Sequence, residues 1–120
     1  MDINELILNV FHFRDQVHIW HWQTRKHNIH VVLGDFYEGL IDELDRLVEA
    51  LLANNMQINA EEIEIPEFAN YDIELVRAAF KQYLGYLEEL HTQFKCSAVL
   101  NILDDMSESG TKVLFLLKFD

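Results

Sequence analysis

Apolar side chains recur every three to four residues along most of this 120-residue chain, and this period constrains the fold more than any other feature of the sequence. It is the period of an α-helix that buries one face. It runs through four segments, at about residues 3–24, 28–54, 71–93 and 96–118. No strand-like alternation of useful length interrupts it. The sequence therefore predicts an all-α protein made of four amphipathic helices.

The connections between these segments differ in length, and their lengths predict the topology. The first and third are short. The second, residues 55–70, contains the only proline, Pro66, and four glutamates, a composition typical of a surface crossing. Such a long connection allows the second and third helices to run parallel. A four-helix bundle with one crossover is the arrangement that includes ferritin-like folds, and we predict it as a single domain over residues 1–120.

The chain is strongly acidic, with 21 Asp and Glu residues against 9 Lys and Arg residues and a net charge of -12. A surface this negative repels phosphate backbones and anionic lipids, so we expect no nucleic-acid or membrane partner. No apolar run approaches the ~20 residues that span a bilayer. The single cysteine, Cys96, cannot form an internal disulfide, and the start of the chain lacks the pattern of a secretion signal. We therefore expect a cytoplasmic protein.

The stretch HWQTRKHNIH, residues 21–30, places a histidine on each side of a short basic turn. If the first two helices form a hairpin, His21 and His30 lie at one end of the bundle, within reach of each other. His30 shares a stripe of the second helix with Asp45 and Glu49, which are one turn apart and can offer oxygens to one ion. Nitrogen and oxygen ligands of this kind suit iron, zinc or manganese.

A single chain cannot bring these four residues to one ion. His30 and Asp45 are 15 positions apart, which separates them by roughly 22 Å along a helix axis. The residues therefore form either two unrelated clusters or two halves of a site that a second copy completes. Antiparallel pairing of the second helix with its copy about a two-fold axis would place His30 of one chain near Asp45 and Glu49 of the other, twice per dimer.

At these residues the chain resembles a known family. The run HWQTRKHNIHVVLGDFYEGLIDELDRLVE is similar to the ferroxidase signature of the Dps-type mini-ferritins, the DNA-binding proteins from starved cells. The HW histidine corresponds to His21, the D-x-x-x-E pair to Asp45 and Glu49, and His30 to the histidine 15 residues before the aspartate. The resemblance, specific over residues 18–49, implies iron at a two-fold interface through the first two helices, with oxidation of Fe(II) by oxygen or peroxide.

A second resemblance covers most of the chain. LGDFYEGLIDELDRLVE and SAVLNILDDMSESGTKVLFLLK resemble short ferritin-like proteins of unknown function encoded by tailed phages. If the chain is phage-encoded, as this resemblance implies, we expect the protein in the cytoplasm of the bacterial host. The N-terminus MDINE is not the lysine-rich tail with which some mini-ferritins bind DNA, so DNA protection is not implied. The chain is shorter than most mini-ferritins, and a dimer suffices for the metal site without a larger cage.

Two further groups of residues are weaker candidates for the site. His18 lies one turn from Trp22 and near His21, and we expect both to pack beside the ligands rather than bind the ion. Glu88-x-x-His91 has the spacing of ligands in intramolecular di-iron bundles. A complete site of that kind needs a second such pair, and the last helix has no histidine. The alternative is a histidine at the edge of the core beside a glutamate.

Two functions follow from the sequence, and they belong to different classes. The first is an iron-binding or similar metal-binding homodimer, or a larger oligomer, that acts as a ferroxidase if the metal is redox-active. The rival is a metal-free acidic interaction protein that uses a ferritin-like bundle to bind a host or phage protein. The resemblance to phage-encoded proteins would fit a phage origin for such a protein.

Overall fold

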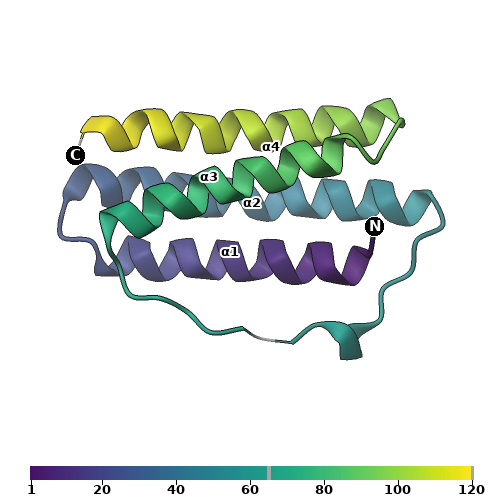
Figure 1. Ribbon diagram of the computed structural model, residues 1–120, viewed down its shortest axis with the longest axis horizontal. Helices are drawn as coiled ribbons and strands as arrows, with labels where there is room; N and C mark the ends of the chain where they lie inside the picture. Colours follow the sequence, from purple (N-terminus) through teal and green to yellow (C-terminus); the bar gives the residue numbers. More distant parts are fainter. Residues whose placement is uncertain (65, 120) are drawn as a thin grey trace.

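Four long helices contain most of the residues that the structure describes. The computed structural model describes residues 1–64 and 66–119, and its long helices are α1 (Ile3–Gln23), α2 (His27–Ala53), α3 (Ile73–His91) and α4 (Ser97–Leu116) (Figure 1). Two 3-10 turns, η1 (Ala60–Glu62) and η2 (Leu117–Phe119), complete the secondary structure, and these described ranges contain no strand. The predicted all-α four-helix bundle is confirmed, and every helix starts and ends within two residues of its predicted bounds.

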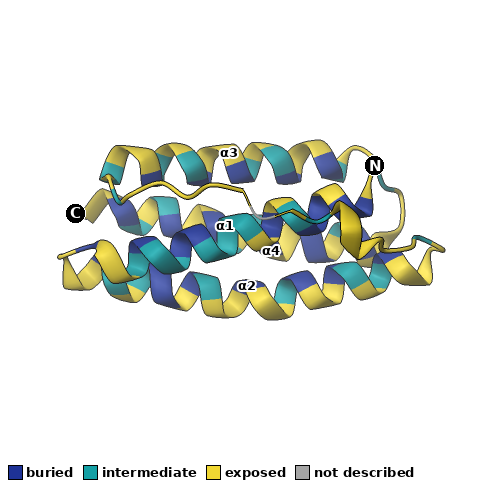
Figure 2. Cartoon of the chain, turned by 90° about the horizontal axis from the view of Figure 1, so that it is seen from below, coloured by how far each residue is buried: buried dark blue, intermediate teal, exposed yellow. Residues whose placement is uncertain are grey.

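The short and long connections produce the predicted topology. α1 and α2 form an antiparallel hairpin, as do α3 and α4, while α2 and α3 run in the same direction (Figure 1). The described residues between α2 and α3, 54–64 and 66–72, run along the outside of the bundle beside α1, and we call them the strap (Figures 1 and 2). α1 packs closely on α2, and α4 packs on both α2 and α3, whereas α1 and α3 pack much less closely. One side of the bundle is therefore more open than the others.

The core is formed by one apolar stripe from each helix, and these stripes face one another (Figure 2). No helix among the described residues is long and apolar enough to cross a membrane. An aromatic group at the centre joins three helices, with the ring of Phe13 stacked on Tyr83 at 4.5 Å between centroids and Phe36 and Phe80 at its edges. The buried apolar residues of the long helices are Ile3, Leu6, Ile7, Val10, Val17 and Trp20 on α1; Ile29, Leu33, Phe36, Leu40, Leu44, Leu47 and Leu51 on α2; Val76, Phe80, Tyr83, Leu87 and Leu90 on α3; and Val99, Ile102, Leu103, Met106 and Val113 on α4.

Polar side chains of α1 hold the strap through its backbone. The buried side chain of Gln16 makes two hydrogen bonds with Ala69: Nε2 donates to the carbonyl oxygen at 2.9 Å, and Oε1 accepts from the N–H at 2.7 Å. Asn4 Oδ1 accepts from Asn59 N–H at 2.7 Å near the start of the strap. Because the strap has little secondary structure of its own, these side chains supply hydrogen bonds that its backbone groups need.

Candidate functional site

His21 and His30 meet at the end of the α1–α2 hairpin, as the sequence predicts. Their rings stack with centroids 3.7 Å apart and planes tilted by 19°. His21 Nδ1 hydrogen-bonds the carbonyl oxygen of His30 at 2.6 Å, and His30 Nδ1 hydrogen-bonds the carbonyl oxygen of His21 at 2.7 Å. The two residues therefore fix each other's position through a reciprocal pair of bonds between side chain and backbone.

These hydrogen bonds also determine where the ring protons lie. A carbonyl oxygen only accepts, so both Nδ1 atoms must carry a proton and donate it. In a neutral imidazole of this tautomer, Nε2 has a free lone pair. No hydrogen bond to either Nε2 occurs within residues 1–64 and 66–119. A histidine that donates one ring N–H to a backbone carbonyl and keeps the other nitrogen free has the arrangement typical of a metal ligand.

Gly34 makes room for this histidine pair on the surface of α2. A Cβ atom at position 34 would lie 2.8 Å from His21 Cε1 and 3.1 Å from His21 Nδ1, closer than such atoms approach. Any larger residue at this position would push the His21 ring away from His30. The glycine was not singled out by the sequence analysis, since its spacing from His21 becomes meaningful only once the two helices are placed side by side.

His18 lies between two aromatic side chains beside the pair. Its ring is stacked on Tyr37 and tilted against Trp22, each at 3.9 Å between centroids, and it is 6.1 Å from the His21 ring. Removal from water lowers the pKa of His18 below its ordinary value of 6.5, and the nearby His21 and Arg14 lower it further. His18 is thus packed between these two rings, while Trp22 is 66% exposed.

Asp45 and Glu49 lie further along α2 and are both exposed. Among the residues that the structure describes, no three His, Cys, Asp or Glu side chains converge on a point where they could hold a metal ion. One chain therefore presents the histidine pair and the carboxylate pair as separate groups, in agreement with the helix spacing.

Arg14, one turn before His18 on α1, contains an incompletely bonded polar group. Its Nη2 bonds Asp15 at 2.8 Å, but its Nε is buried and has no hydrogen-bond partner in the described part of the chain. A buried donor without an acceptor costs about 1–3 kcal/mol.

The Glu88 and His91 pair is placed at the surface between α3 and α4. His91 Nε2 lies 3.1 Å from Asp104 Oδ1, and Glu88 is exposed. The interior between these helices is filled by apolar side chains such as Leu87, Leu90 and Leu103. His91 is thus paired with Asp104 of α4 rather than with Glu88.

The half-buried Glu43 and the buried Tyr83 are polar groups that the sequence analysis did not identify. Burial raises the pKa of Glu43 above its ordinary value of 4.5, although a 3.0 Å hydrogen bond from Ser109 Oγ partly opposes the rise. Burial also raises the pKa of Tyr83, and the charge of Glu43 adds to the effect. The Tyr83 hydroxyl has no hydrogen-bond partner in the described residues. Only the packing of α2, α3 and α4 brings these groups together.

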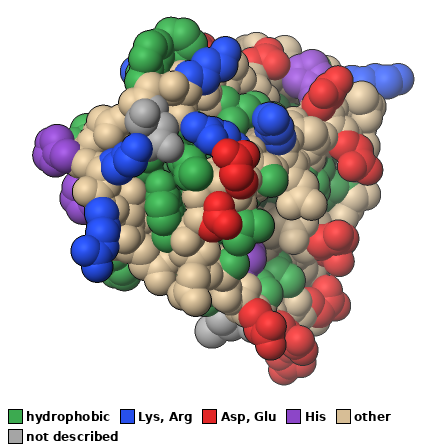
Figure 3. All heavy atoms as spheres, turned by 60° about the vertical axis from the view of Figure 1, so that its left-hand side comes forward, with side chains coloured by type: hydrophobic (Ala, Val, Ile, Leu, Met, Phe, Trp, Pro, Cys, Tyr) green, Lys and Arg blue, Asp and Glu red, His purple; other side chains and the backbone are tan. Residues whose placement is uncertain are grey.

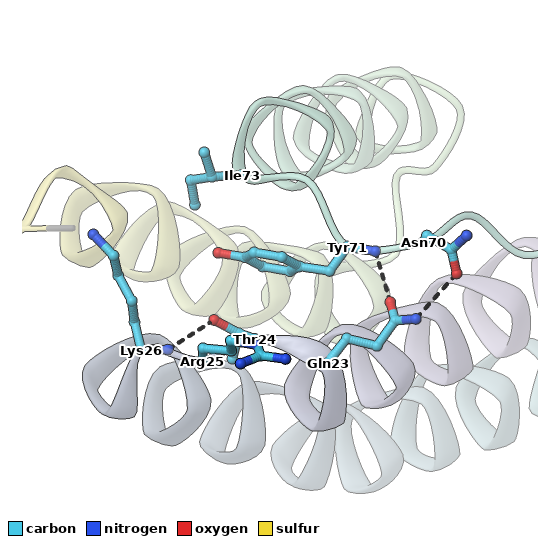
Figure 4. A pocket seen from close by; sticks show the side chains of 7 residues that line it. All are labelled: Gln23, Thr24, Arg25, Lys26, Asn70, Tyr71 and Ile73. Atoms are coloured by element: carbon cyan, nitrogen blue, oxygen red, sulfur yellow. Dashed lines mark hydrogen bonds between the residues drawn. The ribbon is translucent and has the colours of Figure 1, made fainter.

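Basic side chains gather at the end of the bundle that contains the α1–α2 turn (Figure 3). A pocket of about 440 Å³ lies there between this turn and the start of α3, with Arg25, Lys26 and Tyr71 in its lining (Figure 4). Gln23 Oε1 accepts a hydrogen bond from Tyr71 N–H at 2.6 Å across the pocket. This hydrogen bond joins the end of α1 to the residue before the α3 cap. The residues around the pocket therefore help to hold these two parts of the chain together.

The protein is a four-helix bundle. Its α1–α2 hairpin presents a histidine pair, His21 and His30, and a separate carboxylate pair, Asp45 and Glu49. A family model described as "Family of unknown function (DUF5856)" matches residues 21–117, and the chain belongs to this family. The match begins at His21 and includes His30, Asp45 and Glu49. Comparisons with curated proteins and with solved structures gave no match.

Proposed function

We propose that the protein binds iron, or a similar divalent metal, at sites formed between two copies of the chain. Each site takes His21 and His30 from one protomer and Asp45 and Glu49 from its partner. The observation that carries this proposal is the reciprocal bonding of the histidine pair, because it commits both Nδ1 protons to carbonyl oxygens and leaves two Nε2 lone pairs for an ion.

The need for a second copy rests on distance. His30 and Asp45 are separated by roughly 22 Å along α2, and no group of three metal-binding side chains forms in the part of the chain that is described. Antiparallel pairing of two α2 helices about a two-fold axis brings each histidine pair toward the other protomer's carboxylates. A ferritin-like assembly through α1 and α2 has this geometry.

Exposed groups on the α1–α2 hairpin support a contact with a second copy. Trp22, Val31 and Ile41 are large apolar side chains that are 66%, 42% and 45% exposed. Covering these side chains would remove apolar surface from water.

The ligand set is suited to iron in two oxidation states. Neutral imidazoles bind Fe(II) well, and two carboxylates offset the higher charge of Fe(III). In a ferroxidase reaction, Fe(II) is the substrate and loses one electron to dioxygen or peroxide. Zinc or manganese fits the same ligands without this reaction.

The test is an anaerobic titration with Fe(II), followed by admission of air while the near-ultraviolet absorbance of Fe(III) is recorded. The Asp45→Ala/Glu49→Ala variant should lose saturable binding and rapid oxidation while its helical content is unchanged. Asp104→Ala/Glu108→Ala removes the same charge from exposed positions of α4, outside the α1–α2 hairpin, and should keep both. Full metal binding by the first variant would overturn the proposed site.

The second candidate function is a metal-free acidic protein that binds a host or phage protein. The net charge of -12 and the exposed Trp22 favour it, since both suit docking to a basic partner with an apolar centre. A crystal grown with iron in which His21, His30, Asp45 and Glu49 remain without metal would favour this function over the first.

A further inference from the structure

The pocket beside the α1–α2 turn has the size of a small-molecule site. Its volume is about 440 Å³, and sites for small molecules in proteins have volumes of about 300–1,000 Å³. Three consecutive residues of the turn, Thr24, Arg25 and Lys26, line it, together with Tyr71 and Ile73 around the start of α3 (Figure 4). A ligand in this pocket would therefore contact two parts of the chain that are far apart in the sequence.

The charged side chains in this lining are basic. Arg25 and Lys26 line the pocket, and no lining residue in the described part of the chain is Asp or Glu, although the chain contains 21 of these acids. Within residues 1–64 and 66–119, Arg25 makes no hydrogen bond or ion pair. A guanidinium that has no partner in the described protein attracts an anion, even on an acidic chain.

The acids nearest to Tyr71 and Ile73 in the sequence are bonded to α3. Asp72 Oδ1 accepts a hydrogen bond from Glu74 N–H at 2.9 Å, as the cap of this helix. Glu74 Oε1 in turn lies 2.6 Å from Arg77 Nη1. These bonds direct both carboxylates to the first turn of α3, so neither is paired with Arg25.

Two hydroxyl groups supply further donors to the pocket. Thr24 is only 9% exposed, and its Oγ1 accepts a hydrogen bond from Lys26 N–H at 3.3 Å. The hydroxyl hydrogens of Thr24 and Tyr71 have no acceptor among the residues that the structure describes. Figure 4 shows these two hydroxyls turned toward the same part of the pocket. A buried donor without an acceptor is unfavourable, so Thr24 favours a ligand that accepts hydrogen bonds.

This set of donors suits a phosphate group better than a carboxylate. Arginine binds phosphate through two parallel N–H bonds, and the remaining tetrahedral oxygens can accept from hydroxyls in other directions. A carboxylate offers two oxygens in one plane. The positive end of the α2 dipole adjoins the pocket, because Lys26 is the N-cap residue of α2, and no side chain caps this helix end. A doubly charged anion gains more from this dipole than a singly charged one.

We propose that this pocket binds a phosphate group, either as the free anion or as part of a small phosphate monoester. Arg25 donates two N–H groups to the phosphate, and the hydroxyls of Thr24 and Tyr71 donate to its other oxygens. The Tyr71 ring and the Ile73 side chain leave an apolar surface for the rest of a monoester. This inference does not depend on the proposed metal site.

The test uses protein that a chelating resin has freed of metal, at fixed pH and constant ionic strength. Inorganic phosphate, phenyl phosphate and acetate are titrated separately while the backbone amide NMR signals are recorded. We expect phosphate to cause saturable shifts at residues 23–26 and 70–73, and acetate to bind about tenfold more weakly. Absence of saturable shifts at these residues, or equal affinity for acetate, would overturn the proposal.

The two phosphate probes distinguish the sources of the group. Tighter binding of phenyl phosphate than of inorganic phosphate assigns the pocket to a monoester, whose body contacts Tyr71 and Ile73. Equal affinity assigns it to the free anion. Either result supports a phosphate site.

Two pairs of variants locate the phosphate. Arg25→Gln should weaken phosphate binding about tenfold, as expected for loss of a charge-assisted contact. Lys112→Gln, which makes the same charge change at an exposed position of α4, should leave the affinity within about twofold. Tyr71→Phe should also weaken binding, whereas Tyr86→Phe, which alters a tyrosine outside this pocket, should not. Equal effects within either pair would place the phosphate elsewhere and reject the pocket.

Discussion

The imidazoles of His21 and His30 each donate a hydrogen bond from Nδ1 to the other residue's backbone carbonyl oxygen, at 2.6 and 2.7 Å. The eight residues between them include the turn that joins α1 to α2, so this pair also links the ends of the two helices. The arrangement requires close approach of the His21 ring to the backbone of α2, which Gly34 permits. The histidine pair and the glycine thus form one structural unit.

Replacing Gly34 with alanine tests this unit. The added Cβ would lie 2.8 Å from His21 Cε1, so we expect the ring to move, the stack to break and metal binding to be lost. Gly39→Ala is the matched control, because no other atom lies within 4 Å of its added Cβ. That variant should gain about 1 kcal/mol of stability from helix propensity, a gain that Gly34→Ala should not show. Urea denaturation and metal titration of both variants measure these effects.

Mixing two inactive variants tests whether the metal site is shared between chains. His21→Ala/His30→Ala and Asp45→Ala/Glu49→Ala should each bind no metal alone. After they are unfolded and refolded together, a mixed dimer has one complete site, so random pairing should restore about a quarter of the wild-type metal content. Metal analysis after gel filtration measures it. A site formed within one chain would show no recovery.

The half-buried carboxyl of Glu43 predicts a pH-dependent stability. Because the pKa of Glu43 is raised, the folded state favours the protonated carboxyl. The contribution of this carboxyl to the free energy of unfolding is therefore fully present below pH 4.5, and it is lost as the pH rises through the raised pKa. Glu43→Gln should therefore be more stable than the wild type at pH 7, by up to about 1 kcal/mol after solvent screening. The difference should shrink below pH 4.5, where the wild-type carboxyl is also neutral.

Thermal unfolding across this pH range checks the effect. Glu108→Gln, at an exposed position of α4, is the control and should change the curve little. Equal stability of Glu43→Gln and the wild type at pH 7 would contradict the predicted cost of burying the charge.

The two hydrogen bonds between Gln16 and Ala69 predict that loss of the Gln16 side chain loosens the strap from α1. Gln16→Leu removes a donor and an acceptor from the Ala69 backbone, and we expect a loss of about 1–3 kcal/mol in stability. A protease that cuts after glutamate should then cleave the strap, at Glu61 to Glu67, faster than in the wild type. Gln93→Leu, which alters an exposed glutamine, should have neither effect. Unchanged cleavage in Gln16→Leu would show that the strap is held by other contacts.

The sequence predicted the helices well because their signals are local. The three-to-four-residue period of apolar side chains reports directly which face of a helix is buried. At the start of α3, Asp72 caps the helix by accepting a hydrogen bond from Glu74 N–H at 2.9 Å, which is also a local interaction. The long connection predicted the parallel α2 and α3. It did not predict that the strap would bind α1, because hydrogen bonds from Asn4 and Gln16 to a distant backbone have no local pattern in the sequence.

The sequence by itself determined the four helices, the single crossover and the nearness of His21 to His30, since each depends on spacing along the chain. Only the tertiary structure decided that the two histidines bond each other's carbonyl oxygens, that Gly34 makes room for them and that a pocket forms between the α1–α2 turn and the start of α3. These features depend on the distance and rotation between packed helices. That geometry is set by how all the core side chains fit together, which no single segment encodes.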